Sequence, residues 1–150
     1  MKRTLAITFI IMAIVMQIAC SDKELQTVSK SMLIVATAVG DVQATTMSAV
    51  DSKLISNQLG VQIVTVCTKV STAGLQVDAV LRSIQSIDPA SRSKLVNLIT
   101  PISQSLDPQQ IEFIVGIKDP VLKQKITAGF ELARTTISAV QLQLATGGIK

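Results

Sequence analysis

The side chains that carry most enzyme chemistry are scarce in this chain. It contains no histidine, which removes the commonest general base, the commonest zinc ligand and every Ser-His or Cys-His dyad. No glycine-rich phosphate loop and no dinucleotide-binding fingerprint occurs. The sequence therefore predicts no catalytic residue, no metal site and no cofactor, and we expect a protein that is not an enzyme. Of the acidic residues outside the Asp-Pro pairs, five are single and dispersed: Asp41, Asp51, Asp78, Glu112 and Glu131.

A few polar residues remain that could assemble into a site. Asp78 and Arg82 have the spacing of an ion pair on one exposed helix face, and Lys69 and Arg134 could join them. The segment Ser91–Lys94 has a spacing that would formally suit Ser-Lys catalysis. Because no general base accompanies these groups, we interpret them as solvated surface side chains.

The amino terminus has the layout of a signal peptide. A charged start that includes Lys2 and Arg3 precedes an uncharged apolar run from Leu5 to Ala19. A helix that crosses a bilayer alone needs about 20 apolar residues, and this run is shorter. We therefore predict a signal peptide over residues 1–19, and a mature chain that begins at Cys20.

The stretch Gln17-Ile18-Ala19-Cys20 resembles the lipobox of bacterial lipoproteins, in which a small residue precedes a cysteine at the end of the apolar run. The resemblance implies cleavage between Ala19 and Cys20, a diacylglycerol thioether on Cys20, and acylation of the new amino group by a fatty acid such as palmitate. Gln17 departs from the pattern, which usually has an aliphatic residue there. An ordinary signal peptide with an incidental cysteine, and an uncleaved anchor, are the alternatives.

The resemblance also implies a location in the cell envelope. Ser21, and not aspartate, follows the cysteine, which in a Gram-negative host implies the outer membrane, facing the periplasm. A lipidated Cys20 has no thiol for a disulfide, so the other cysteine stands alone. Cys67 ends the apolar stretch that begins at Val61, where we expect a small buried hydrophobic residue.

The charge of the chain does not indicate a nucleic-acid partner. The formal net charge of +4 falls to +2 when Lys2 and Arg3 leave with the signal peptide. The remaining basic residues are scattered, and only Lys123 and Lys125 come close together. Single-strand binding needs a basic groove with stacking aromatic rings, and the chain has no Tyr and no Trp. We therefore expect no nucleic-acid binding.

Three Asp-Pro dipeptides divide the second half of the chain. An Asp side chain at an N-cap accepts hydrogen bonds from free helix amides, and Pro suits the first helical position. We therefore predict that Asp88, Asp107 and Asp119 are helix caps, with tight turns as the alternative.

Apolar residues recur at steps of three and four, which is the pattern of one helix face. We predict an all-α fold: an antiparallel bundle of four main helices with a short extra helix over Gln109 to Gly116, preceded by a signal-peptide helix. Residues 20–150 form a single domain in this prediction. Gly60 is expected in the first interhelical turn, whereas Gly74 and Gly129 are expected to allow close packing. The four stripes are Leu25, Val28, Met32, Val35, Val39 and Val42; Ile63, Val66, Val70, Ala73, Val77, Val80, Ile84 and Ile87; Leu95, Leu98, Ile102 and Leu106; and Leu122, Ile126, Ala133, Ile137, Val140 and Leu144.

One stretch contradicts this pattern locally. The residues from Val61 to Val70 are rich in Val, Ile and Thr, which favours a strand by propensity. The helical stripe continues through them to Ile87, whereas the two-residue alternation ends at Ser71. We therefore predict a helix there.

The sequence favours a non-catalytic, membrane-anchored envelope lipoprotein. Its helical bundle would act as a structural or protein-interaction module, with the membrane bound through the lipid on Cys20 and with an unknown envelope protein or a second copy as partner. The alternative is a bundle that binds a small apolar ligand, such as a lipid or quinone, in its core.

Overall fold

The computed structural model describes residues 23–146, which form four α-helices and one short 3₁₀ helix, with no strand in this range. The predicted all-α fold of four main helices and a short extra helix is therefore confirmed. The predicted signal-peptide helix lies outside the described residues. The elements are α2 (Lys23–Asp51), α3 (Asn57–Ser83), α4 (Pro89–Ser105), the 3₁₀ helix η2 (Glu112–Gly116) and α5 (Pro120–Thr146).

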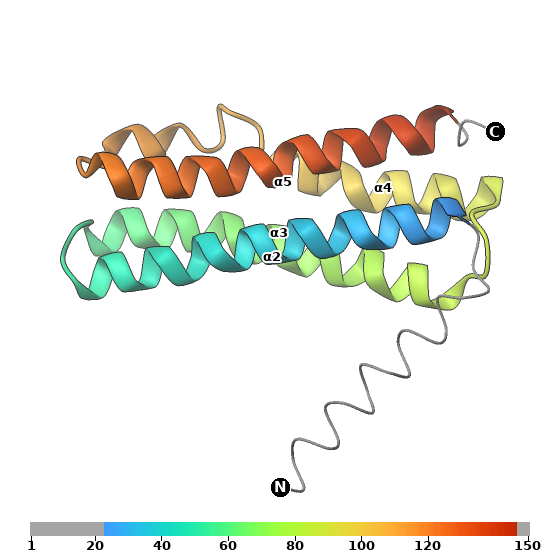
Figure 1. Ribbon diagram of the computed structural model, residues 1–150, viewed down its shortest axis with the longest axis horizontal. Coiled ribbons are helices and arrows are strands. Elements are labelled where there is room, and N and C mark those ends of the chain that lie inside the picture. Colours follow the sequence, from blue (N-terminus) through green and yellow to red (C-terminus); the bar gives the residue numbers. More distant parts are fainter. Residues whose placement is uncertain (1–22, 147–150) are drawn as a thin grey trace, which may run out of the picture.

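The helices form two layers along one long axis (Figure 1). Helices α2 and α3 make one layer, and α4, η2 and α5 make the other. Helix α2 packs on α3 and α5, and α4 packs on the same two helices from the opposite corner. At 1.5 Å per residue, α2, α3 and α5 are each about 40 Å long, whereas the 17 residues of α4 reach only about 26 Å. The segment η2 packs on α3 and α5 and so fills the corner that α4 leaves open.

The first interhelical turn differs from the prediction. Helix α2 ends at Asp51, and Lys53 adopts the left-handed conformation with φ of 58°. Ser56 caps α3, because its side-chain oxygen accepts a hydrogen bond from the Leu59 amide at 3.2 Å. Gly60 is therefore not in the turn as predicted: it lies in the first turns of α3, where an added Cβ would overlap Val50 Cγ2. Its missing side chain lets α2 and α3 approach each other.

The glycines inside the helices serve different purposes. At Gly129 in α5, an added Cβ would overlap Val42 Cγ2 of α2 and lie 3.4 Å from the Ala38 carbonyl oxygen, which confirms that this glycine allows close packing. At Gly74 the nearest atom to an added Cβ is Met32 Cε at 3.9 Å, an ordinary contact, so the prediction of a tight approach is wrong there. Nothing lies within 4 Å of an added Cβ at Gly40.

Two of the three Asp-Pro pairs begin helices. Asp88 is the N-cap of α4, and its Oδ1 accepts a hydrogen bond from the Ser91 amide at 2.7 Å. Asp119 precedes α5, and its Oδ1 accepts a hydrogen bond from the Leu122 amide, also at 2.7 Å. Each aspartate therefore satisfies one of the amides that a helix start leaves without an intrahelical partner.

The helix start predicted at Asp107 is absent. Asp107 Oδ1 accepts a hydrogen bond from the Gln109 amide at 2.9 Å, and its backbone carbonyl accepts one from Gln110 at 2.9 Å, which is the bonding of a turn. The short helix begins five residues later, at Glu112, with no side-chain cap. After the turn, Ile111 and Ile114 are buried and belong to the core.

The core is aliphatic and continuous through the four helices. Phe130 is fully buried, and the buried hydroxyl of Thr46 donates to the Val42 carbonyl at 2.7 Å. In α4 the buried stripe runs through Ile99, whereas the predicted Leu98 is only half-buried. Val61 to Val70 is helical as predicted, with Ile63, Val66 and Val70 buried. Helix α3 ends at Ser83, however, so Ile84 and Ile87 of the predicted stripe lie beyond it, and Ala73 is only half-buried.

Of the helices in the described range, α2 is the one long and apolar enough to cross a membrane by length and composition. A third of its most apolar window is buried inside the bundle. Core helices of soluble proteins and signal sequences meet the same criterion, so membrane association is compatible with α2 but does not follow from it.

Candidate functional site

The predicted lipidation and cleavage residues, Cys20 and Ala19, lie outside the described residues. In the sequence, Cys20 comes three positions before Lys23, the first residue of α2.

A half-buried ion pair holds this end of the bundle together. Arg92 in the first turn of α4 meets Glu24 in the first turn of α2 with two parallel bonds, Nη1 to Oε1 at 2.6 Å and Nη2 to Oε2 at 2.9 Å. Arg92 Nη1 also donates to the Leu144 carbonyl at 2.9 Å, near the end of α5, and Nη2 donates to the Ile87 carbonyl at 3.4 Å. We refer to these contacts as the Arg92 clamp.

The Arg92 clamp joins three helices and the connection before α4. The side chains of Arg92 and Glu24 are only 21% and 11% exposed, so solvent screens their interaction less than it screens a surface pair. The planar guanidinium suits a carboxylate in this two-bond geometry, which Lys cannot reproduce. No local spacing in the sequence indicates the clamp, because Glu24 and Arg92 are 68 positions apart.

The polar residues considered as a site do not come together. Asp78 and Arg82 form the predicted exposed ion pair on α3, with Nε to Oδ2 at 2.6 Å. Arg134 instead pairs with Glu131 on its own helix, Nη2 to Oε2 at 2.6 Å. A hydrogen bond to Asp78 raises the pKa of Arg82, and the attraction of the negative Asp78 carboxylate raises it further.

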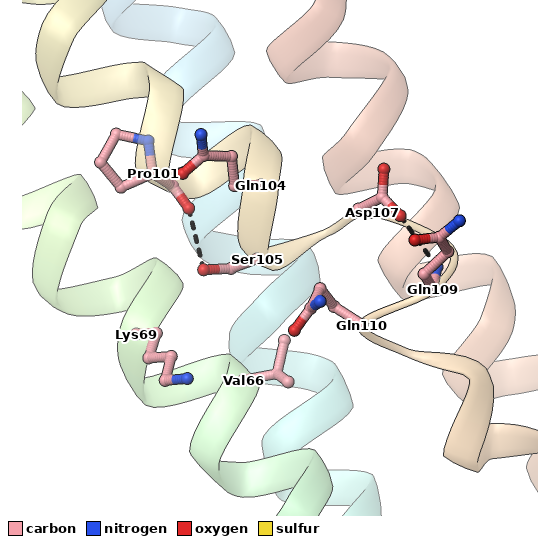
Figure 2. A pocket seen from close by; sticks show the side chains of 8 residues that line it. All are labelled: Val66, Lys69, Pro101, Gln104, Ser105, Asp107, Gln109 and Gln110. Atoms are coloured by element: carbon pink, nitrogen blue, oxygen red, sulfur yellow. Dashed lines mark hydrogen bonds between the residues drawn. The ribbon is translucent and has the colours of Figure 1, made fainter.

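A polar hollow of about 510 Å³ lies between α3 and the turn after α4 (Figure 2). Lys69 and Val66 border it from α3, and Gln104 comes from α4 on the opposite side. Ser105 donates its hydroxyl to the Pro101 carbonyl at 2.8 Å, so this hydroxyl is used within its own helix. The remaining lining residues are Asp107, Gln109 and Gln110.

The charged side chains that line this polar hollow are Lys69 and Asp107. The Asp107 carboxylate is already bonded to the Gln109 amide, and no other carboxylate and no thiol lines the hollow. Lys69 is thus the cationic side chain of this hollow, among amide and hydroxyl groups.

A second hollow, of about 620 Å³, lies between the end of α2 and the first half of α3. Its lining is mainly aliphatic, from Met47 and Val50 on α2 and from Val61 and Val64 on α3. It opens at the surface and does not enter the core. We call it the α2–α3 groove.

Residues 23–146 contain no group of three or more His, Cys, Asp or Glu side chains that could hold a metal ion. The Cys67 thiol is buried, and desolvation raises its pKa to about 11 against a partial opposing effect of its backbone hydrogen bond. A thiol that stays protonated at neutral pH is a poor nucleophile, so Cys67 is a packing residue.

Comparisons with protein families, with curated proteins and with solved structures found no match to this chain.

Proposed function

We propose that this protein is a lipoprotein of the cell envelope, anchored through acyl chains on Cys20, whose helical bundle is a non-catalytic structural or protein-interaction module. In a Gram-negative host, Ser21 favours the outer membrane with the bundle facing the periplasm. More than one acyl chain gives durable anchoring where one chain does not.

The Arg92 clamp is the observation that carries this proposal. Glu24 lies four residues after Cys20, and its bonds to Arg92 fix the start of α2 to α4 and α5. A pull on the amino terminus is therefore transmitted through Glu24 and Arg92 to α4 and α5 as well as to α2. This arrangement suits a domain that is held by its amino terminus.

The surface of the described bundle supports the non-catalytic part of the proposal. Its polar hollow has no acid–base pair, its buried thiol is protonated, and its exposed ion pairs are local contacts within single helices. These features suit a module that binds or supports other molecules.

The mass of the mature protein, purified from its native envelope, tests the anchor. We expect a chain that begins at Cys20 with a diacylglycerol and an added acyl group, palmitate being the fatty acid expected. Cys20→Ser should abolish incorporation of a labelled palmitate analogue and release the chain from the membrane, whereas Cys67→Ala is the matched control that should change neither. An unmodified peptide containing Cys20 would remove the anchor from the proposal.

Affinity purification of the acylated protein from its envelope tests the interaction part. A partner recovered in fixed stoichiometry, or a self-assembly, supports a structural or interaction module. A monomer with no partner contradicts it.

The alternative function, binding of a small apolar ligand, has one observation in its favour. The α2–α3 groove offers an aliphatic surface of suitable size, at the surface and not in the core. Native mass spectrometry of the protein released from its envelope should show a bound lipid or quinone if this alternative holds, and a clean ligand-free mass contradicts it.

A further inference from the structure

The surface that α2 and α3 share carries four large apolar side chains that are more than half exposed. On α2 these are Leu33 (68% exposed) and Met47 (56%), and on α3 they are Val61 (64%) and Leu75 (71%). We call this surface the α2–α3 face. Buried apolar area is the main source of affinity between a protein and an apolar phase, so such side chains are potential contacts.

The four side chains lie on one side of the bundle. Met47 and Val61 line the same α2–α3 groove. Met32 lies opposite Gly74, and Leu33 and Leu75 each follow these residues by one position. One step along each of two antiparallel helices turns both side chains toward the same outer side, so Leu33 and Leu75 also point to this face.

The stripe positions between these four on each helix are uncharged, whereas Asp51 and Lys69 line the groove beside Met47 and Val61. The intervening positions of the two stripes are small or aliphatic: Ala36, Gly40 and Ala44 on α2, and Val64, Thr68 and Ser71 on α3. Asp41 follows Gly40, and Lys69 follows Thr68, by one position in the sequence, so each charged side chain points about 100° away from that neighbour around the helix axis. Lys69 borders the polar hollow of Figure 2 as well as the groove, and its long side chain can carry its charge to the edge of the face.

The chain outside the described residues indicates what covers this face. Its apolar run ends just before Cys20, three positions before Lys23, the first residue of the helix that contributes Leu33 and Met47. The Arg92 clamp holds the start of α2 against α4 and α5. Tethering makes contact with the membrane effectively intramolecular, which raises the local concentration of lipid at this face above that of any soluble partner.

We propose that the bundle lies with its α2–α3 face on the lipid surface, its long axis parallel to the membrane. This inference rests on the anchoring at Cys20 put forward under the proposed function. Leu33, Met47, Val61 and Leu75 enter the boundary between headgroups and acyl chains, as the apolar face of an interfacial helix does. The layer of α4, η2 and α5 then faces away from the membrane and is the surface open to partners (Figure 1).

Fluorescent labels at two positions test the orientation. Gly40→Cys puts a label at the centre of the α2–α3 face, where an added Cβ meets nothing within 4 Å. Ser138→Cys puts the matched label on an exposed position of α5. The buried Cys67 should remain unlabelled in the native protein. The acylated full-length mature protein is inserted into vesicles of phosphatidylethanolamine and phosphatidylglycerol that contain a spin-labelled quencher lipid.

Among protein that floats with the vesicles, we expect strong quenching at position 40 and weak quenching at position 138. Each apolar side chain contributes about a tenfold preference for lipid contact, so Leu33→Ser with Leu75→Ser should shift the population about 100-fold away from this orientation. The control pair, Leu132→Ser with Leu142→Ser, removes two exposed apolar residues of α5 and should leave the quenching unchanged.

The outcomes separate this inference from the anchor. Flotation with equal quenching at both positions, or quenching at 40 that survives the Leu33→Ser, Leu75→Ser change, overturns the orientation and leaves the anchor intact. Shielding of position 40 that increases with protein density and not with quencher lipid means that a second copy covers the face, which also overturns it. Loss of flotation with an unacylated Cys20 refutes the anchor, and the orientation with it.

Discussion

The contact between α5 and α2 at Gly129 gives the sharpest test of the packing. Gly129→Ala adds one methyl group at a place where it overlaps Val42 Cγ2, with the Ala38 carbonyl oxygen 3.4 Å away. Val42 is only 2% exposed and belongs to the continuous core, so it has little room to move. The helices must separate or the Val42 side chain must leave its preferred rotamer.

The expected magnitude is a difference between two effects. Replacing Gly by Ala inside a helix stabilises it by about 1 kcal/mol, because the unfolded chain loses backbone freedom. Overpacking a filled core costs about 1–3 kcal/mol. The net change at Gly129 is therefore a loss of about 1 kcal/mol. Gly40→Ala receives only the favourable effect, since its added methyl meets nothing, and should gain up to about 1 kcal/mol.

Urea unfolding followed by far-UV circular dichroism measures both variants, with the midpoint as readout and an unchanged slope as the check that unfolding remains two-state. We expect the midpoint to fall for Gly129→Ala and to rise for Gly40→Ala. In a double-mutant cycle, Val42→Ala should remove the overlap, so the two changes together should cost less than their sum. A Gly129→Ala protein as stable as Gly40→Ala would refute the close contact of α2 with α5.

Three further predictions concern single side chains. Arg92→Ala should lower the free energy of unfolding by about 3 kcal/mol in thermal or urea denaturation, because it removes the main partner of the half-buried Glu24. The control Arg134→Ala, which breaks an exposed ion pair, should cost under about 0.5 kcal/mol. Equal effects of the two changes would contradict the clamp. Hydrogen bonds from the Ser91 amide, and then from the Ser91 hydroxyl, lower the pKa of Asp88 below its ordinary value of 3.8. The stabilisation of α4 by Asp88 is therefore present above pH 3.8 and is lost as the pH falls through the lowered pKa. Asp88→Asn should reduce this acid dependence of the helicity measured by circular dichroism, and an unchanged pH profile speaks against the cap. The pKa of the Cys67 thiol is raised to about 11, so this thiol should react with alkylating reagents only as fast as the bundle opens. Mass spectrometry measures the labelling, and rapid labelling of the folded protein would show that Cys67 is not buried.

The sequence predicts the helices well because the information is local. The three- and four-residue steps place apolar side chains on one face, and the bundle buries all of the predicted stripe residues in α2 and α5 and most of those in α3. Asp88 and Asp119 were recognisable because an N-cap contacts an amide only three residues away. The periodicity also outweighed the strand propensity of Val61 to Val70, since tertiary burial overrides propensity.

Predictions failed where a local pattern fits two structures. Asp107-Pro108 has the same two residues as the other pairs, but its carboxylate bonds two residues ahead and forms a turn. Gly60 suits a turn or a close contact equally well, and only the position of Val50 decides for the contact. The left-handed position in the first turn is taken by Lys53, a residue that no turn rule selects.

By itself, the sequence determined the helical class and most of the inward faces, because each of these depends on neighbours within about one or two helical turns. The charged start and the apolar run before Cys20 are likewise local features of the sequence. Only the tertiary structure decided that Arg92 meets Glu24, that Gly129 and Gly60 lie at helix contacts while Gly40 does not, and that exposed apolar residues of α2 and α3 share one face. The physical reason is that these relations depend on the register and order in which the helices pack, which no spacing within a single helix records.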